Sequence, residues 1–150
     1  MNAAHSGLRV RDLRVEIVAA DGARRMPVDG VSFSVGPREC VALLGESGCG
    51  KSLSALAALR LLPEGLRIAG GSVELDGVDL FALPEQAMSA VRGGRLAMIF
   101  QEPQTSLNPV LSVGQQIVEG LAVHRSLRGA AARAEAARLL GTKATIVMPA

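Results

Sequence analysis

The sequence predicts an α/β fold built around one phosphate-binding loop, and two observations carry this prediction. Residues 45–52 read Gly-Glu-Ser-Gly-Cys-Gly-Lys-Ser and match G-x-x-x-x-G-K-[S/T] at every fixed position. The loop also stands between two segments of the expected kinds. Residues 40–44 are an apolar run typical of a buried strand, and residues 51 to about 62 carry leucines and alanines at helical spacing.

The loop residues suit the binding of a triphosphate. Glycines allow a tight turn whose N–H groups point inward, and the positive end of the following helix adds to them. The Lys51 side chain can reach the β- and γ-phosphates, and the Ser52 hydroxyl can ligate Mg²⁺. The alternative is an ordinary glycine-rich turn, which the flanking strand and helix disfavour. We therefore expect a nucleoside triphosphate to bind at Gly45, Glu46, Ser47, Gly48, Cys49, Gly50, Lys51, Ser52 and Leu53.

Composition narrows the class of protein. At 150 residues and 49% hydrophobic, the chain can form one compact domain with a core. Basic residues are dispersed, the net charge is only +2 and three phenylalanines are the sole aromatics, which argues against nucleic-acid binding. The sequence has no apolar run of about 18 residues and no apolar secretion signal. Cys40 and Cys49 are expected to be free thiols in a reducing cytoplasm, and His5 and His124 lack ligand spacing for a metal.

The N-terminal third predicts an antiparallel sheet. Apolar residues alternate over 8–17, imperfectly at Asp12, and again over 31–35 before Gly36-Pro37. A turn is expected at 20–23. A second β segment is expected over 70–80, with Asp76-Gly77 as its turn.

The remaining chain predicts helices and a second buried strand. Pro84 begins a short helix that Gly93-Gly94 can end, and residues 96–100 read as a buried strand. Gln101 follows that strand at its carboxyl end, where ligands bind in open α/β sheets. Further helices are expected over about 113–124 and 129–140.

Two stretches resemble a known family. One is the loop at 45–52, and the other is Met-Ile-Phe-Gln-Glu-Pro-Gln-Thr-Ser-Leu-Asn-Pro at 98–109. Together they resemble the ATP-binding subunits of ABC transporters, specifically the oligopeptide, dipeptide and nickel importer group. That group shows F-Q-[D/E]-P-x-T-S-L-N-P with its glutamine about fifty residues after the loop lysine, the interval between Lys51 and Gln101 here.

The resemblance spans about residues 8–140 and implies a fold class. The implied fold class is α/β, the N-terminal half of an ABC-type ATPase of the P-loop NTPase fold. This half consists of an antiparallel β subdomain and the start of a parallel-sheet core. We expect residues 1–140 to be a partial ATP-binding domain. Residues 141–150 fit nothing in the family, so they are expected to be a tail from truncation or a frameshift.

The resemblance also implies roles for particular residues. Gln101 is the Q-loop glutamine, which contacts Mg²⁺ or the attacking water, so Lys51 and Gln101 are the catalytic candidates and Ser52 and Gln101 the metal ligands. Ile17 stands where family members stack adenine on an aromatic ring. Arg38 stands where the family usually has glycine, which predicts a positive φ at this residue.

The implied function is the ATP-binding subunit of an importer for peptides or similar small solutes, with MgATP as cofactor. Its implied partners are transmembrane permease subunits, a second ATP-binding domain in a dimer and, indirectly, an extracytoplasmic solute-binding protein. The implied location is peripheral, on the cytoplasmic face of the inner membrane.

Three family features are missing from the sequence: an L-S-G-G-Q signature, a strand ending in Asp-Glu and a switch histidine. Residues 111–115, Leu-Ser-Val-Gly-Gln, mimic the signature but coincide with the group's L-x-V-G-x-Q stretch. Two alternatives therefore stand beside the transport ATPase. One is a nucleotide-binding fragment without turnover. The other is a small P-loop kinase with Arg92 and Arg95 as lid arginines, which the F-Q-E-P context disfavours.

Overall fold

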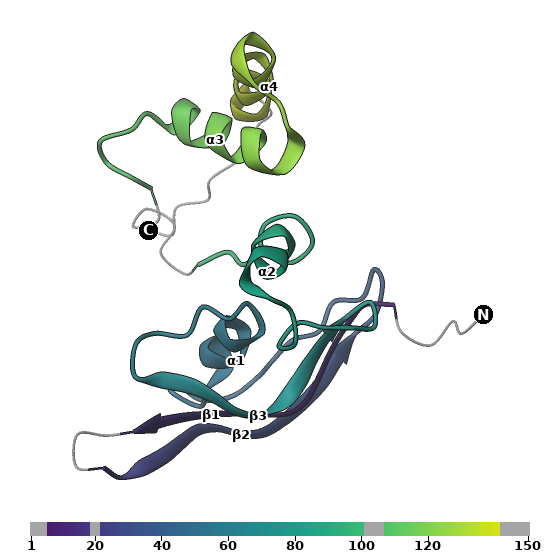
Figure 1. Cartoon of the computed structure of the whole chain (residues 1–150), viewed down its shortest axis with the longest axis vertical. Helices are drawn as coiled ribbons and strands as arrows, with labels where there is room; N and C mark the ends of the chain where they lie inside the picture. Colours follow the sequence, from purple (N-terminus) through teal and green to yellow (C-terminus); the bar gives the residue numbers. More distant parts are fainter. Residues whose placement is uncertain (1–5, 19–21, 101–106, 142–150) are drawn as a thin grey trace. The chain divides into compact units, whose positions relative to one another are not determined.

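The computed structural model describes residues 6–18, 22–100 and 107–141. The chain divides into two compact units, residues 1–92 and 93–150. The first unit holds the sheet and the phosphate loop, and the second holds a pair of helices (Figure 1).

The first unit is built on a four-stranded antiparallel sheet. Its strands are β1 (Leu8–Val18), β2 (Arg24–Val35), β3 (Leu66–Leu75) and β4 (Val78–Asp79). They lie in the order β2-β1-β3-β4, and all three pairings are antiparallel (Figure 1). The predicted antiparallel subdomain is confirmed.

A bulge in β1 explains the imperfect alternation at Asp12. Val10 and Leu13 are both buried although three residues apart, and the strand register shifts between them. Asp12 has a φ of 44° and its N–H donates to the Ser32 hydroxyl at 2.8 Å. Across the sheet, a Cβ on Gly71 would lie 2.5 Å from the Asp12 carbonyl oxygen, so only glycine fits there. The bulge thus keeps the apolar residues of β1 on one face.

Two helices complete the first unit, α1 (Lys51–Ala58), which packs on β1 and β2, and α2 (Glu85–Val91). The core consists of aliphatic side chains from the sheet, α1, α2 and their connections. Its buried members are Val10, Leu13, Val15, Val28, Ala57, Ala58, Leu59, Val73, Leu75, Leu80, Met88 and Val91.

Helix α1 begins at Lys51 as predicted but ends at Ala58, four residues before the predicted end. Arg60 takes a φ of 54°, its N–H donates to the Ala57 carbonyl at 2.9 Å, and the Leu61 N–H donates to the Leu56 carbonyl at 2.9 Å. This pair of bonds is a Schellman motif, which satisfies the last carbonyls of a helix and reverses its direction. Helical spacing alone therefore predicted too long a helix.

Neither apolar run predicted to be a buried strand forms one. Residues 40–44 and 96–100 are assigned to no strand, and Leu44 and Ile99 are 91% and 92% exposed. A buried strand needs neighbours for its backbone hydrogen bonds and apolar cover on both faces. The described strands pair only antiparallel, so the predicted start of a parallel sheet is absent from the described residues.

The second unit contains α3 (Val113–Arg125) and α4 (Gly129–Gly141), which pack against each other and confirm the two predicted helices. Leu121, Ala132 and Ala136 are buried there.

Candidate functional site: the phosphate loop

The phosphate loop is anchored to the sheet through Gly50. This residue has a φ of 92°, and a Cβ on it would lie 2.6 Å from the Pro27 carbonyl oxygen and 3.0 Å from the Val28 side chain. Backbone of the loop therefore rests directly on β2. Any other residue at position 50 would face both a left-handed backbone and a steric clash.

The ammonium of Lys51 closes the loop from within. Its Nζ donates to the carbonyl oxygens of Gly45 at 2.7 Å and Glu46 at 2.6 Å, and lies 3.2 Å from the Cys49 sulfur. A Cβ on Gly45 would point into the same space, 2.6 Å from that sulfur and 3.8 Å from Nζ. The loop thus surrounds a positive charge and leaves no room for a side chain at its first position.

The start of α1 suits an anion and a cation ligand. Gly50 is the N-cap, no side chain caps the helix, and the first turn carries no acidic residue. The N–H groups and dipole at this end are therefore available to a phosphate. Ser52 is exposed at the same end, where its hydroxyl can ligate a metal ion, whereas Leu53 is half-buried. The donor set fits a triphosphate with a bound divalent cation.

The structure places Ile17 on the face of the sheet that carries the loop. Val28, which packs under Gly50, is paired with Val15, and Ile17 lies two residues further along β1. Alternate residues of a strand share a face, so Ile17 lies on the side of the buried Val15 while Glu16 points the other way. The second catalytic candidate, Gln101, lies outside the described residues.

A cluster that sequence reasoning missed fixes the far end of α1. Arg60 donates to the Leu83 carbonyl at 2.6 Å and lies 3.3 Å from the Glu85 carboxylate. Arg92 donates to the same carboxylate and, at 2.7 Å, to the Leu59 carbonyl. The Arg92 hydrogen bond, with the charges of Arg92 and Arg60, holds the pKa of Glu85 below its ordinary value.

These contacts hold Arg92 between the end of α1 and the start of α2. A lid arginine, as the kinase alternative requires, would have to move instead. The partners are 7 and 32–33 residues away in the chain. No local sequence signal marks such a cluster.

The signature-like residues at 111–115 have a local structural role. Ser112 is the N-cap of α3, and it forms a capping box with Gln115, whose N–H donates to the Ser112 hydroxyl at 3.2 Å. The neighbouring Gln116 donates to the carbonyls of Asn108 and Leu111, each at 3.1 Å. Gln116 is the final glutamine of the L-x-V-G-x-Q stretch. Its place in that stretch is the sequence signal from which its contacts with Asn108 and Leu111 could have been predicted.

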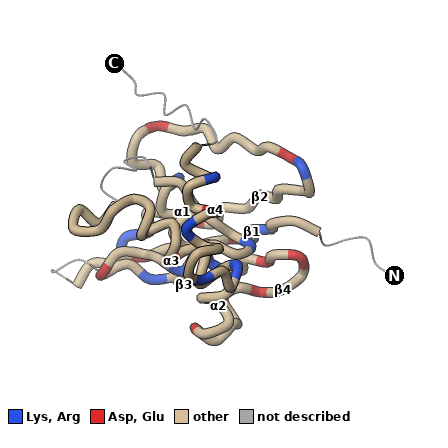
Figure 2. The backbone as a smooth tube through the Cα atoms, turned by 90° about the horizontal axis from the view of Figure 1, so that it is seen from above, with Lys and Arg blue, Asp and Glu red and all other residues tan. Residues whose placement is uncertain are grey.

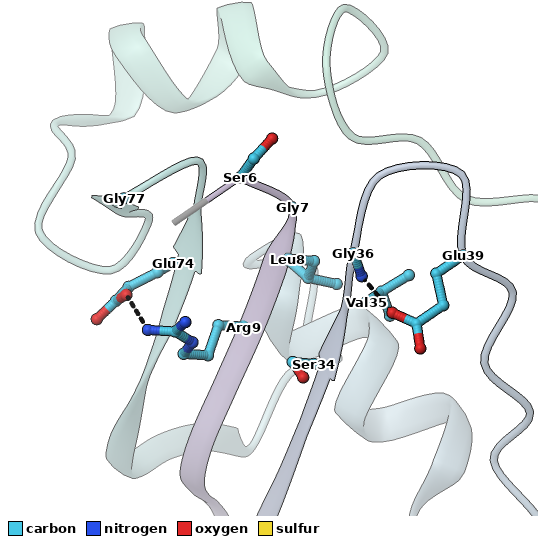
Figure 3. Close-up of a pocket in the computed structure, with 10 residues that line it drawn as sticks. All are labelled: Ser6, Gly7, Leu8, Arg9, Ser34, Val35, Gly36, Glu39, Glu74 and Gly77. Atoms are coloured by element: carbon cyan, nitrogen blue, oxygen red, sulfur yellow. Dashed lines mark hydrogen bonds and ion pairs between the residues drawn. The ribbon is translucent and has the colours of Figure 1, made fainter. Parts of the chain in front are cut away.

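The turn after β2 and a small hollow lie at the opposite end of β1 from Ile17. Arg38 has a φ of 61°, so the positive φ predicted there is confirmed, and the Gly36 N–H donates to the Glu39 carboxylate at 2.6 Å. The hollow has a volume of about 150 Å³ (Figure 3). On its other side Arg9 pairs with Glu74 at 3.9 Å, and the drawn side chains do not converge on one point (Figure 3).

Comparison with known proteins decides the family. A family model described as ABC transporter matches residues 28–147, which include the whole phosphate loop. The chain belongs to the ABC transporter family. The resemblance found in the sequence is thereby confirmed.

No described helix is both long enough and apolar enough to cross a membrane.

Individual relatives of this ABC transporter chain cover most of it. It is 46% identical over 133 residues to a peptide import ATP-binding protein of Brucella melitensis, covering 89% of this chain and 40% of the relative. It is 48% identical over 134 residues to the peptidoglycan transport ATP-binding protein YejF of Agrobacterium fabrum, covering 89% and 24%. It is 46% identical over 114 residues to the oligopeptide transport ATP-binding protein AppD of Bacillus subtilis, covering 75% and 35%. The chain thus spans 40% or less of the length of these curated relatives.

Solved structures confirm the fold of this ABC transporter chain. It is similar to an ATP-binding cassette solved as a dimer in a post-hydrolysis state with ADP and Pi bound. The TM-score is 0.72 at 19% identity, over 89% of this chain and 55% of the other. The similarity extends beyond the antiparallel sheet, so the fold class is that of an ABC ATPase cassette.

Proposed function

We propose that this chain binds MgATP at the loop from Gly45 to Leu53, as part of an ATP-binding subunit of an ABC importer for peptides or similar small solutes. The observation that carries the proposal is the position of Lys51. Its ammonium is held at 2.6–2.7 Å from two carbonyls inside a glycine loop, at the uncapped start of α1. A cation beside the uncapped N–H groups of a helix start offers the donors that a triphosphate needs.

The proposed roles follow from this geometry and from the family. Lys51 binds the phosphates, the Ser52 hydroxyl ligates Mg²⁺, and Ile17 contacts the base at the end of β1. Gln101 completes the site as a second Mg²⁺ ligand or as a contact to the attacking water. Catalysis by such a site consists mainly of positioning and of stabilising charge on the transferred phosphoryl group.

The proposed partners are transmembrane permease subunits and a second ATP-binding domain, and a solute-binding protein acts indirectly. The relatives named for peptide import and oligopeptide transport support this assignment. The corresponding location is the cytoplasmic face of the inner membrane.

The test is equilibrium binding of MgATP to the chain by calorimetry. Lys51→Ala should weaken binding at least about 10-fold, the effect of losing one charge-assisted phosphate contact. Lys143→Ala removes the only other lysine and serves as the charge-matched control. Equal MgATP affinity for wild type and Lys51→Ala would contradict the proposed site.

The second candidate function is nucleotide binding without turnover. It is favoured by the described part of the site, where the loop offers a cation and a hydroxyl but no general base. A positioned base contributes roughly 10²- to 10⁴-fold to a rate. Steady-state phosphate release by the purified chain, with Lys51→Ala as the contamination control, separates the two. Release that the Lys51 variant abolishes would establish turnover and exclude the non-catalytic candidate.

A further inference from the structure

We infer that Arg25 is the residue that holds the nucleotide base, by stacking its guanidinium on the face of the base. This inference rests on the proposed function and adds a base-binding residue to it. Arg25 lies on β2, directly opposite Ile17 on β1, and Leu66 on β3 is the partner of Ile17 on the other side. The three residues form a strip across three strands.

The strip lies on the face of the sheet that carries the phosphate loop. Directly paired residues of an antiparallel sheet point to the same face. Ile17 shares its face with the buried Val15, whose partner Val28 packs against Gly50. The register shifts by one residue on β2 between these two pairs, so Arg25 and Val28, three residues apart, lie on the same face. Arg25 therefore projects on the loop side.

The distance along the sheet suits a nucleotide. Val15 and Ile17 are separated by two residues, or about 7 Å along the strand. A ribose separates the phosphates from the base in any nucleotide, so a base whose phosphates fill the loop lies one sugar further along the sheet. The strip from Arg25 to Leu66 is the sheet surface at that position.

The guanidinium of Arg25 is available for this contact. Arg25 is exposed, and within the described part of the chain no ion pair or hydrogen bond engages its side chain. Its neighbour Arg24 lies on the opposite face and pairs with Glu16 at 3.8 Å, where Glu16 also accepts a hydrogen bond from Arg67. Other basic positions are interspersed with acidic ones along the strands (Figure 2).

Chemistry favours stacking at this position. The strip contains no aromatic ring, while half-buried Ile17 and Leu66 offer an apolar floor. A planar guanidinium stacks on a π system and is weakly hydrated, so it can cover one face of a base. A stacked guanidinium contacts the π face of the base and not its hydrogen-bonding edge. Adenine and guanine should therefore bind about equally well.

The test compares MgATP, MgGTP and magnesium tripolyphosphate, which lacks a base, as ligands in calorimetric titrations. Arg25→Ala should weaken MgATP and MgGTP by a similar factor of roughly 2 to 30 and leave tripolyphosphate affinity unchanged. Arg24→Ala removes the same charge one residue away, on the opposite face, and should leave all three affinities unchanged. Thermal unfolding of each variant checks that the sheet is intact.

Three outcomes overturn the inference while leaving the proposed function in place. They are unchanged MgATP affinity in Arg25→Ala, an equal loss for tripolyphosphate, and equal losses in Arg24→Ala and Arg25→Ala. A wild-type chain that is folded but binds neither MgATP nor tripolyphosphate overturns the proposed function itself, and this inference with it.

Discussion

Gly50 brings the phosphate loop onto the sheet at the carbonyl of Pro27, because a Cβ at position 50 would lie 2.6 Å from that oxygen. The loop and β2 are therefore in direct backbone contact. The same residue is the N-cap of α1 with a φ of 92°. One glycine thus sets both the direction of the helix and its distance from the sheet.

We predict that Gly50→Ala destabilises the chain and weakens MgATP binding together. A residue held in a left-handed conformation costs about 1–3 kcal/mol, and relief of the clash would move Lys51 away from its loop partners. Denaturant unfolding and calorimetry measure the two effects. The control is Gly120→Ala in α3, where the added Cβ would meet no atom within 4 Å beyond its chain neighbours and the adjacent helix backbone. Helix propensity should stabilise this variant by about 0.5–1 kcal/mol. A fully stable Gly50→Ala variant would show that the loop is not tied to β2.

We predict that Gly71→Ala destabilises the sheet by at least about 1–3 kcal/mol. Its φ is 87°, and the added Cβ would lie 2.5 Å from the carbonyl oxygens of both Arg11 and Asp12 at the bulge. Gly70→Ala is the matched control, since its Cβ would meet only the Arg14 side chain, at 4.0 Å. The measurement is the free energy of unfolding from denaturant titration. Equal values for the two variants would contradict the close contact between Gly71 and the bulge in β1.

We predict that Ile17→Tyr tightens MgATP binding. An aromatic ring adds roughly 0.5–1.5 kcal/mol beyond area burial, which corresponds to about 2- to 10-fold in affinity. Ile17 is half-buried at the end of β1, so the ring can extend over the strand end. The measurement is the Kd for MgATP, with tripolyphosphate as the ligand that should not respond. No gain would place the base elsewhere.

We predict that the Glu85 cluster makes stability fall in acid. Because Arg92 and Arg60 hold the folded-state pKa of Glu85 below its ordinary value near 4.5, the carboxylate stabilises the fold above that pH. This stability is lost as pH falls through the lowered folded-state pKa. At pH 7, Glu85→Gln should lower the Tm, and the difference from wild type should shrink below about pH 4.5.

Glu64 is exposed, so Glu64→Gln removes the same charge outside the cluster and is the control for this experiment. A Tm difference between wild type and Glu85→Gln that does not change between pH 7 and acid would contradict the ion-pair explanation.

Several parts of this molecule were determined by the sequence itself, because their causes are local. The start of α1 at Lys51 follows from Gly50 and the helical spacing after it. The positive φ of Arg38 was expected from the resemblance, because the family usually has glycine at that position. The strand β1 was predictable because its apolar residues alternate on both sides of Asp12. The loop was identified from the spacing of its glycines, lysine and serine, and the comparisons confirmed the family. Phosphate and metal binding by these residues stays a prediction.

Only the tertiary structure decided the features whose partners are distant in the chain. The contact between the segment after α1 and the start of α2 depends on Arg60 and Arg92, which meet Glu85 from two different segments. The face of Arg25 depends on its register with Ile17 across the sheet. Residues 40–44 have the apolar composition of a buried strand, but composition supplies neither hydrogen-bond partners nor cover, and these come from other segments. Local sequence patterns specify conformations whose hydrogen-bond partners are near in the chain. Strand pairing, register and burial depend on segments that are distant in the chain.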